Sequence, residues 1–150
     1  MNEETVTLAI VKRLKQEGYQ VHSVDFPPSG AGLRLKPNKR VRGNKGVVIP
    51  DIIASRNEIC LIMENKDHFS PPDFEKLNTL FSSGEYSLAL EQLSSELKTT
   101  LFLRAIGLPK EECDPEKATI LLNLVDFLVG VEQDGSCLIL RNINVGWEEL

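Results

Sequence analysis

Residues 50–66 read Pro-Asp-Ile-Ile-Ala-Ser-Arg-Asn-Glu-Ile-Cys-Leu-Ile-Met-Glu-Asn-Lys, and the predicted fold is arranged around them. It contains two apolar runs rich in β-branched residues, which predict strands over 47–54 and 58–66. The link between them is so short that the two strands must form a hairpin. Each strand also carries an acid, Asp51 in the first and Glu64 near the end of the second. A charge in an apolar strand is costly unless it has a partner.

The flanking sequence predicts a mixed α/β arrangement around this hairpin. Apolar residues at helical spacing predict a helix over 3–17, and alternation predicts a strand over 19–26 that ends at the turn 27–30. Ser70, followed three residues later by Asp73, is typical of a capped helix start. The remaining predicted elements are helices over 70–84, 86–98 and 114–122, a strand over 99–106, and a C-terminal hairpin of strands 124–132 and 137–141.

Length and composition indicate one globular domain over residues 1–150. The chain is 41% hydrophobic and 26% charged, as in soluble proteins. It has no apolar stretch long enough to span a bilayer and no signal-peptide pattern at its start, so we expect a cytoplasmic protein without a membrane partner. The three cysteines, Cys60, Cys113 and Cys137, are widely spaced, which predicts reduced thiols rather than a zinc site.

Positive charge is concentrated in one segment of an acidic chain. The net charge is −5, yet residues 33–46 carry six basic side chains and no acid. The rest of the chain holds 11 basic and 22 acidic residues. A local positive segment attracts phosphate while the remainder repels it, so this glycine-rich segment is a candidate nucleic-acid contact; a solvated basic loop without a ligand is the alternative. The candidate binding residues are Arg34, Lys36, Lys39, Arg40, Arg42 and Lys45.

The acids of the hairpin predict a metal-dependent hydrolytic site. Successive residues of a strand alternate between its faces, so Glu64 and Lys66 share one face. If the hairpin also pairs Asp51 near Glu64, two carboxylates and an ammonium group converge. Mg²⁺, or Mn²⁺ as its substitute, prefers such hard oxygens, and the backbone carbonyl of Asn65 would add one more. Lys66 would position the attacking water. The alternative is a solvent-facing hairpin end with an ordinary Glu–Lys pair.

The motif Pro50-Asp51 followed by Glu64-Asn65-Lys66 resembles that of the PD-(D/E)XK nuclease superfamily, and in particular its Holliday-junction-resolvase-type members. The resemblance implies a restriction-endonuclease-like mixed sheet flanked by helices, with an αβββαβ core over residues 3–106 and here a C-terminal helix and hairpin in addition. It also implies that Asp51 and Glu64 bind Mg²⁺ while Lys66 assists the water. Some members of the superfamily add a glutamate from the first helix, for which Glu4 is the best match and Glu3 the second.

These observations lead us to expect a metal-dependent DNA endonuclease. A homodimer would supply the two sites that duplex cleavage needs, and a larger complex could supply target recognition. The alternative is a non-catalytic nucleic-acid or protein-binding module that retains the nuclease fold. Geometry separates the two: catalysis requires the carboxylates of Asp51 and Glu64 to lie within reach of one metal ion, with Lys66 beside them.

Overall fold

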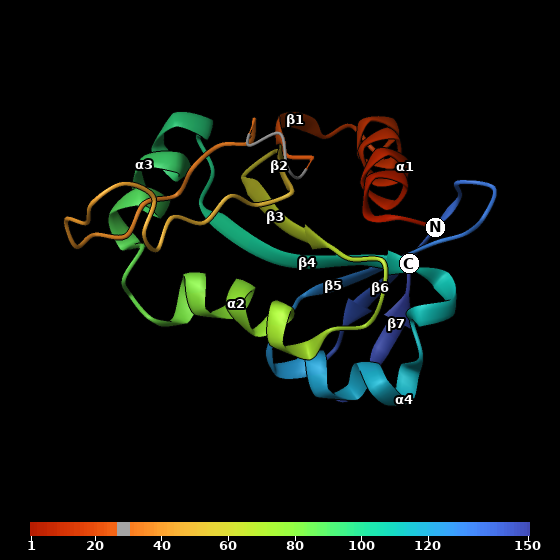
Figure 1. Cartoon of the computed structure of the whole chain (residues 1–150). Helices are drawn as coiled ribbons and strands as arrows, with labels where there is room; N and C mark the ends of the chain where they lie inside the picture. Colours follow the sequence, from red (N-terminus) through yellow and green to blue (C-terminus); the bar gives the residue numbers. More distant parts are fainter. Residues whose placement is uncertain (27–30) are drawn as a thin grey trace.

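The computed structural model of the chain describes residues 1–26 and 31–150. One seven-stranded mixed sheet runs through the molecule, its strands lie side by side in chain order, and helices cover both of its faces (Figure 1). No helix within these ranges is long and apolar enough to cross a membrane. The elements are α1 (Glu3–Gln16), β1 (Gln20–Val24), β2 (Ile52–Arg56), β3 (Ile59–Asn65), α2 (Pro71–Ser82), α3 (Ser87–Leu97), β4 (Leu101–Pro109), η1 (Lys110–Glu112), α4 (Pro115–Ala118), η2 (Thr119–Asn123), β5 (Phe127–Val131), β6 (Cys137–Asn142) and β7 (Trp147–Glu149).

The sheet contains the hairpin that the sequence predicts, as its second and third strands. Strands β2 and β3 pair antiparallel, with Ile52 opposite Met63, and Asn57 turns the chain between them with a φ of 54°. Strands β3, β4 and β5 then run parallel to one another. Parallel neighbours need a crossover connection. Helices α2 and α3 supply it between β3 and β4, and α4 with η2 supplies it between β4 and β5. The predicted α/β class and order of elements are therefore confirmed.

Two hydrophobic cores lie on opposite faces of the sheet. On one face, Val6 and Ile10 of α1 pack against the strands together with Leu61 and Met63 of β3. On the other face, helices α2, α3 and the α4–η2 segment pack against a cluster that includes Cys60 and Ile62 of β3. Alternate residues of β3 thus face opposite cores, as a strand buried on both sides requires.

The first predicted strand of the hairpin is wrong in its bounds. Strand β2 begins at Ile52 rather than at residue 47, and Val48 instead forms an isolated bridge with Leu35. Pro50 explains the break, because it has no N–H to donate to a neighbouring strand. Strand β7 was not predicted, since three residues are too short to show a periodic pattern. The predicted turn at 27–30 lies outside the described residues.

A close contact holds α1 against the end of β3. The side chain of Asn65 is buried, and its Nδ2 donates to Thr7 Oγ1 of α1 at 3.0 Å. Gly107 of β4 lies directly beside this contact. A Cβ at position 107 would lie 2.3 Å from Asn65 Oδ1 and 2.3 Å from Ile10 Cδ1, so only glycine fits there.

We therefore expect Gly107→Ala to destabilise the protein by about 1–3 kcal/mol, the usual effect of inserting a methyl group into a packed core. Gly146→Ala is the control, because a Cβ at position 146 meets nothing within 4 Å. Its effect should stay within about 0.5 kcal/mol. Denaturant melts of the two variants beside the wild type measure both values. Equal stabilities of the two variants would contradict the packing of Asn65 against Gly107.

Candidate active site

The carboxyl groups of Asp51 and Glu64 meet at the end of the β2–β3 hairpin. The Asp51 N–H donates to the Met63 carbonyl at 3.0 Å although the ladder pairs Met63 with Ile52, so the register shifts at Asp51. The carboxylate of Asp51 accepts a 2.7 Å hydrogen bond from the N–H of Asn65, and the side chains of Asp51 and Glu64 are hydrogen-bonded to each other. The convergence required for the predicted site is therefore present in the structure.

Burial raises the pKa of both carboxyl groups and so favours one retained proton on the pair. Asp51 is only 7% exposed, and burial raises its pKa, although the Asn65 N–H and the hydrogen bond with Glu64 act in the opposite direction. Burial also raises the pKa of Glu64, and the charge of Asp51 raises it further, to well above its usual range. Two carboxylates in contact cannot both ionise freely. Glu64 therefore keeps its proton more strongly and donates it to the Asp51 carboxylate.

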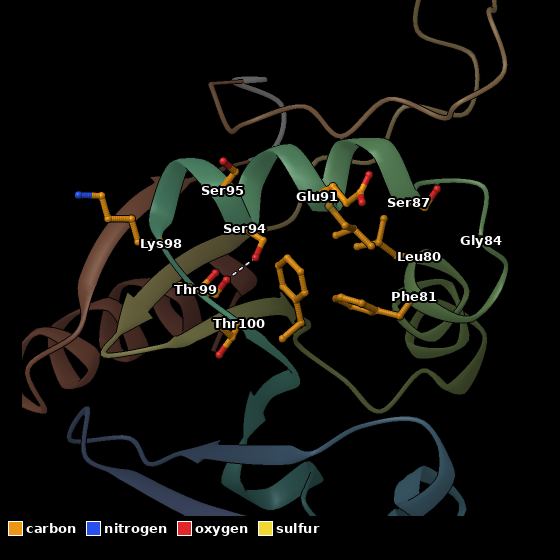
Figure 2. Close-up of a pocket in the computed structure, with 12 residues that line it drawn as sticks. Leu80, Phe81, Gly84, Ser87, Glu91, Ser94, Ser95, Lys98, Thr99 and Thr100 are labelled. Atoms are coloured by element: carbon orange, nitrogen blue, oxygen red, sulfur yellow. Dashed lines mark hydrogen bonds between the residues drawn. The ribbon is translucent and has the colours of Figure 1, made fainter.

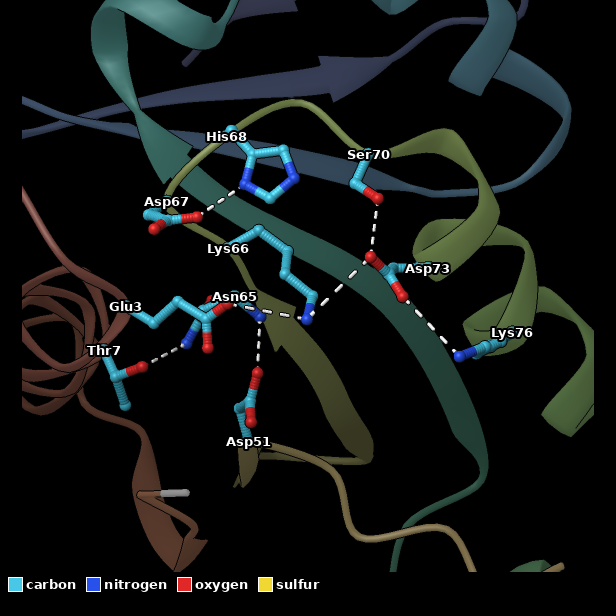
Figure 3. Close-up of polar contacts among 10 residues, drawn as sticks. All are labelled: Glu3, Thr7, Asp51, Asn65, Lys66, Asp67, His68, Ser70, Asp73 and Lys76. Atoms are coloured by element: carbon cyan, nitrogen blue, oxygen red, sulfur yellow. Dashed lines mark hydrogen bonds and ion pairs between the residues drawn. The ribbon is translucent and has the colours of Figure 1, made fainter. Parts of the chain in front are cut away.

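Lys66 extends from the same end of β3 and lies between two further acids (Figure 3). Its Nζ is 3.5 Å from Glu3 Oε1 and 3.9 Å from Asp73 Oδ2. Burial lowers the pKa of Lys66, but the charges of Glu3 and Asp73 outweigh burial and the net direction is upward. The amine is consequently protonated at neutral pH. It can hold a water molecule or stabilise a negatively charged oxygen, but it cannot act as a base.

Asp73 is a site residue that sequence reasoning missed. The Ser70–Asp73 spacing was interpreted as a capping box, and α2 does begin there. However, the Ser70 hydroxyl donates to Asp73 Oδ2 at 2.5 Å and caps no backbone N–H. This bond and the nearby lysines lower the pKa of Asp73, so its carboxylate is charged beside Lys66. The signal was the helix start four residues after Lys66, since side chains in a first turn project back toward the preceding strand.

The N-terminus of α1 brings Glu3 and Glu4 to the same region. Asn2 caps this helix by accepting a 2.8 Å bond from the Thr5 N–H, which places both glutamates in the first turn. The sequence favoured Glu4 as an additional ligand, but Glu3 is the residue that reaches Lys66. Both glutamates line a cavity of about 40 Å³ together with Thr7, Phe26 and Asp51.

The oxygens at this site suit a hard divalent cation that is only partly held by protein. Asp51 and Glu64 supply two carboxylates. In an extended strand the N–H and carbonyl of one residue point to the same side, so the Asn65 carbonyl faces Asp51 as its N–H does. Among the described residues, no group of three or more His, Cys, Asp or Glu side chains could hold a metal ion alone. Mg²⁺ commonly takes one or two carboxylates and completes its shell with water and phosphate oxygens.

The 37–46 part of the basic segment lies at the end of α2 away from Asp73 and Lys66. It packs against the turn between α2 and α3, where Asn38 Nδ2 donates to the Gly84 carbonyl at 3.1 Å. The carboxylates lie near the opposite end of α2, where Asp73 contacts Lys66. The six predicted binding residues form no ion pair with an acid in the part of the chain that the structure describes. Within the segment, Arg34 donates to Asn44 Oδ1 at 2.9 Å.

A separate apolar groove offers no competing catalytic group. It has a volume of about 690 Å³ and lies between α2, α3 and the start of β4, with the rings of Phe81 and Phe102 5.6 Å apart on its floor (Figure 2). Glu91 is its single acid. The cysteines offer none either, since burial raises the pKa of Cys60 and of Cys113 to about 12 and keeps both thiols protonated.

No protein-family model matches the chain, and a comparison with curated proteins finds no similar sequence. The geometry of Asp51, Glu64 and Lys66 is therefore the basis on which a function can be assigned.

The raised pKa of Glu64 predicts a stability that depends on pH. The folded state holds the Glu64 proton more tightly than the unfolded chain, so wild-type stability falls as pH rises from about 4.5, the unfolded value, through the folded pKa. Glu64→Gln keeps a donor for Asp51 and cannot ionise. We expect the variant to match the wild type near about pH 4 and to exceed it at pH 8 by about 1 kcal/mol or more, roughly 2–4 °C in Tm.

Thermal melts between these pH values measure the difference. The control is Glu58→Gln, a change at an exposed glutamate in the turn between β2 and β3. Its Tm should differ from that of the wild type by a constant amount at all pH values. A Glu64→Gln difference that does not grow with pH would show that the carboxylate pair shares no proton.

Proposed function

We propose that this chain is a metal-dependent DNA endonuclease with a site of the PD-(D/E)XK type. One observation carries the proposal: the carboxyl groups of Asp51 and Glu64 meet at the end of the β2–β3 hairpin, and Lys66 extends from the same end of β3. The order of α1 to β4 is one helix, three strands, two helices and a strand, which is the expected αβββαβ order with a second helix before β4. With α1 and α2 on opposite faces of the sheet, it supports the proposal further.

Asp51, Glu64 and the carbonyl of Asn65 would hold Mg²⁺ or Mn²⁺. The bound ion would polarise the scissile phosphate and acidify a water molecule. The protein's own contribution to the reaction is the placement of the Lys66 amine and of the acids beside it. The protonated Lys66 orients the attacking water and offsets charge that develops on the phosphate oxygens. Glu3 and Asp73 keep the Lys66 amine charged and limit its movement.

The shared proton links metal binding to pH. Both carboxylates must be ionised to act as ligands, so the Glu64 proton leaves when the ion binds. Affinity for the ion should therefore rise with pH until Glu64 is ionised in the free protein. One chain contributes one such site, so cleavage of both strands of a duplex requires two copies or two successive events.

We expect Mg²⁺ and Mn²⁺ to raise the Tm of the wild type but not of Asp51→Asn. An ion present at ten times its Kd stabilises the folded state by about 1.4 kcal/mol, which corresponds to roughly 3–6 °C. The control is Asp67→Asn, since Asp67 is an exposed neighbouring acid that pairs with His68. The shift should be larger at pH 8 than at pH 6. Equal shifts in wild type and Asp51→Asn would place the metal elsewhere.

We expect the wild type to cut DNA in Mg²⁺ or Mn²⁺, and Asp51→Asn or Lys66→Ala to cut at least about 100-fold more slowly, the usual effect of removing one group that stabilises transition-state charge. The assay uses a panel of supercoiled plasmid, linear duplex, single strands, flaps and four-way junctions. Lys15→Ala removes the same charge from the far end of α1 and should cut normally.

The alternative of a non-catalytic module predicts a different outcome from the same panel. A folded wild type that binds DNA but cuts none of the substrates with either metal would support that alternative. Cleavage that survives in both Asp51→Asn and Lys66→Ala would mean that another site, or a contaminating enzyme, is responsible.

A further inference from the structure

A basic groove lies between the 37–46 part of the loop and the turn that joins α2 to α3. Its volume is about 950 Å³. Four of the six basic residues of the segment line it, all exposed to solvent, and none of them forms an ion pair within the described parts of the chain. The opposite wall contributes one acid, Glu85. The four basic residues are Lys39, Arg40, Arg42 and Lys45.

Hydrogen bonds attach this loop to the helical layer on both sides of its tip. The N–H of Asn38 donates to the Glu85 carbonyl at 2.6 Å, and its side-chain oxygen accepts from the Leu88 N–H at 3.0 Å. On the other side, the Tyr86 hydroxyl donates to the Gly46 carbonyl at 2.6 Å. Leu35, at the base of the loop, is buried in the core. The groove is therefore a preformed surface whose position relative to α2 is fixed.

The chemistry of the groove suits a sugar–phosphate backbone rather than unpaired bases. Proteins that hold single strands combine basic residues with aromatic side chains on which the bases stack. Tyr86 is the aromatic residue among those that line this groove, and it is only 8% exposed with its hydroxyl already engaged. The groove thus offers positive charge without a stacking platform, which is the pattern for binding a duplex through its phosphates.

Helix α2 spans the distance from this groove to Asp73, which contacts Lys66 beside the carboxylates. Its first turn carries Asp73, which contacts Lys66, and the residue after its last turn, Ser83, lines the groove. Ten residues of α-helix span about 15 Å. One base pair of duplex DNA occupies about 3.4 Å of the helix axis, so this distance corresponds to about four or five base pairs.

We propose that the groove holds the backbone of duplex DNA about four to five base pairs from the phosphate at Asp51 and Glu64. This inference rests on the proposed function, because the distance is measured from a scissile phosphate. Duplex DNA must therefore extend at least this far on one side of the cut. The requirement is one-sided, because the groove lies at one end of α2.

The test begins with a long duplex whose cut position has been mapped with end labels. Duplexes shortened from either side of that position are then compared. Cleavage should fall at least tenfold when one side becomes shorter than about five base pairs, and it should tolerate shortening of the other side. The double variant Arg40→Ala/Arg42→Ala should lose this preference and cut long duplexes as slowly as the wild type cuts short ones.

Binding without divalent metal tests the groove independently of catalysis. Removing two phosphate contacts should reduce the slope of log affinity against log salt by about 1.8. Lys12→Ala/Lys15→Ala removes two exposed charges from α1 and is the matched control, which should leave the slope unchanged. Lys39→Ala/Lys45→Ala repeats the test if the arginine variant fails to fold.

The outcomes separate the two proposals. A wild type that cuts duplex DNA without any flank requirement overturns the distance, and an unchanged salt slope in both groove variants overturns the groove. Stronger groove-dependent binding of single strands or duplex RNA overturns the assignment to duplex DNA. A wild type that cuts nothing, while the groove variants still lose duplex binding, overturns the nuclease and the distance but keeps the groove as a duplex-binding surface.

Discussion

The hydrogen-bonded carboxylate pair of Asp51 and Glu64 is the interaction on which the rest of the site depends. Two acids rarely meet in a protein interior, because burial and mutual repulsion both oppose their ionisation. Here the end of the β2–β3 hairpin brings them together, since the Asp51 N–H donates to the Met63 carbonyl and the Asp51 carboxylate accepts from the Asn65 N–H. The Asn65 N–H and a retained proton make the arrangement tolerable. A pair held in this way is unfavourable for folding and is suited to exchange its proton for a cation.

The residues of the pair could be predicted from the sequence, but not all of their neighbours could. The alternating faces of a strand and the short link at Asn57 are local features. They sufficed to predict that Glu64 and Lys66 share one face and that the two strands form a hairpin, which brings Asp51 close to Glu64 if the two pair. Glu3 and Asp73 reach Lys66 only because α1 and α2 pack on the two faces of the sheet. The angles and offsets of that packing depend on long-range contacts, which one sequence does not reveal.

The start of β2 is a second feature that depends on long-range pairing and could not be predicted from the sequence. An apolar run from 47 to 54 predicted a continuous strand, yet the chain before Pro50 pairs with Leu35 instead. Local propensity correctly predicted an extended backbone, but it could not predict that Val48 pairs with Leu35. This exchange of partners bends the chain away from the sheet. It allows the loop to lie along the helical layer, where Asn38 and Tyr86 fix it.

Because the strands pair in chain order, the parts of the site can form in sequence while the protein is being synthesised. Chains fold from the N-terminus as they leave the ribosome, and neighbouring strands can pair as soon as both have emerged. The two acids that pair with the Lys66 amine, Glu3 and Asp73, lie within the first 73 positions, so these ion pairs can form early. Glu64 gains its partner on β4, Ile106, only more than forty residues later. Because burial is the main cause of the raised pKa of both acids, we expect those pKa values to rise fully only after β4 has paired with β3.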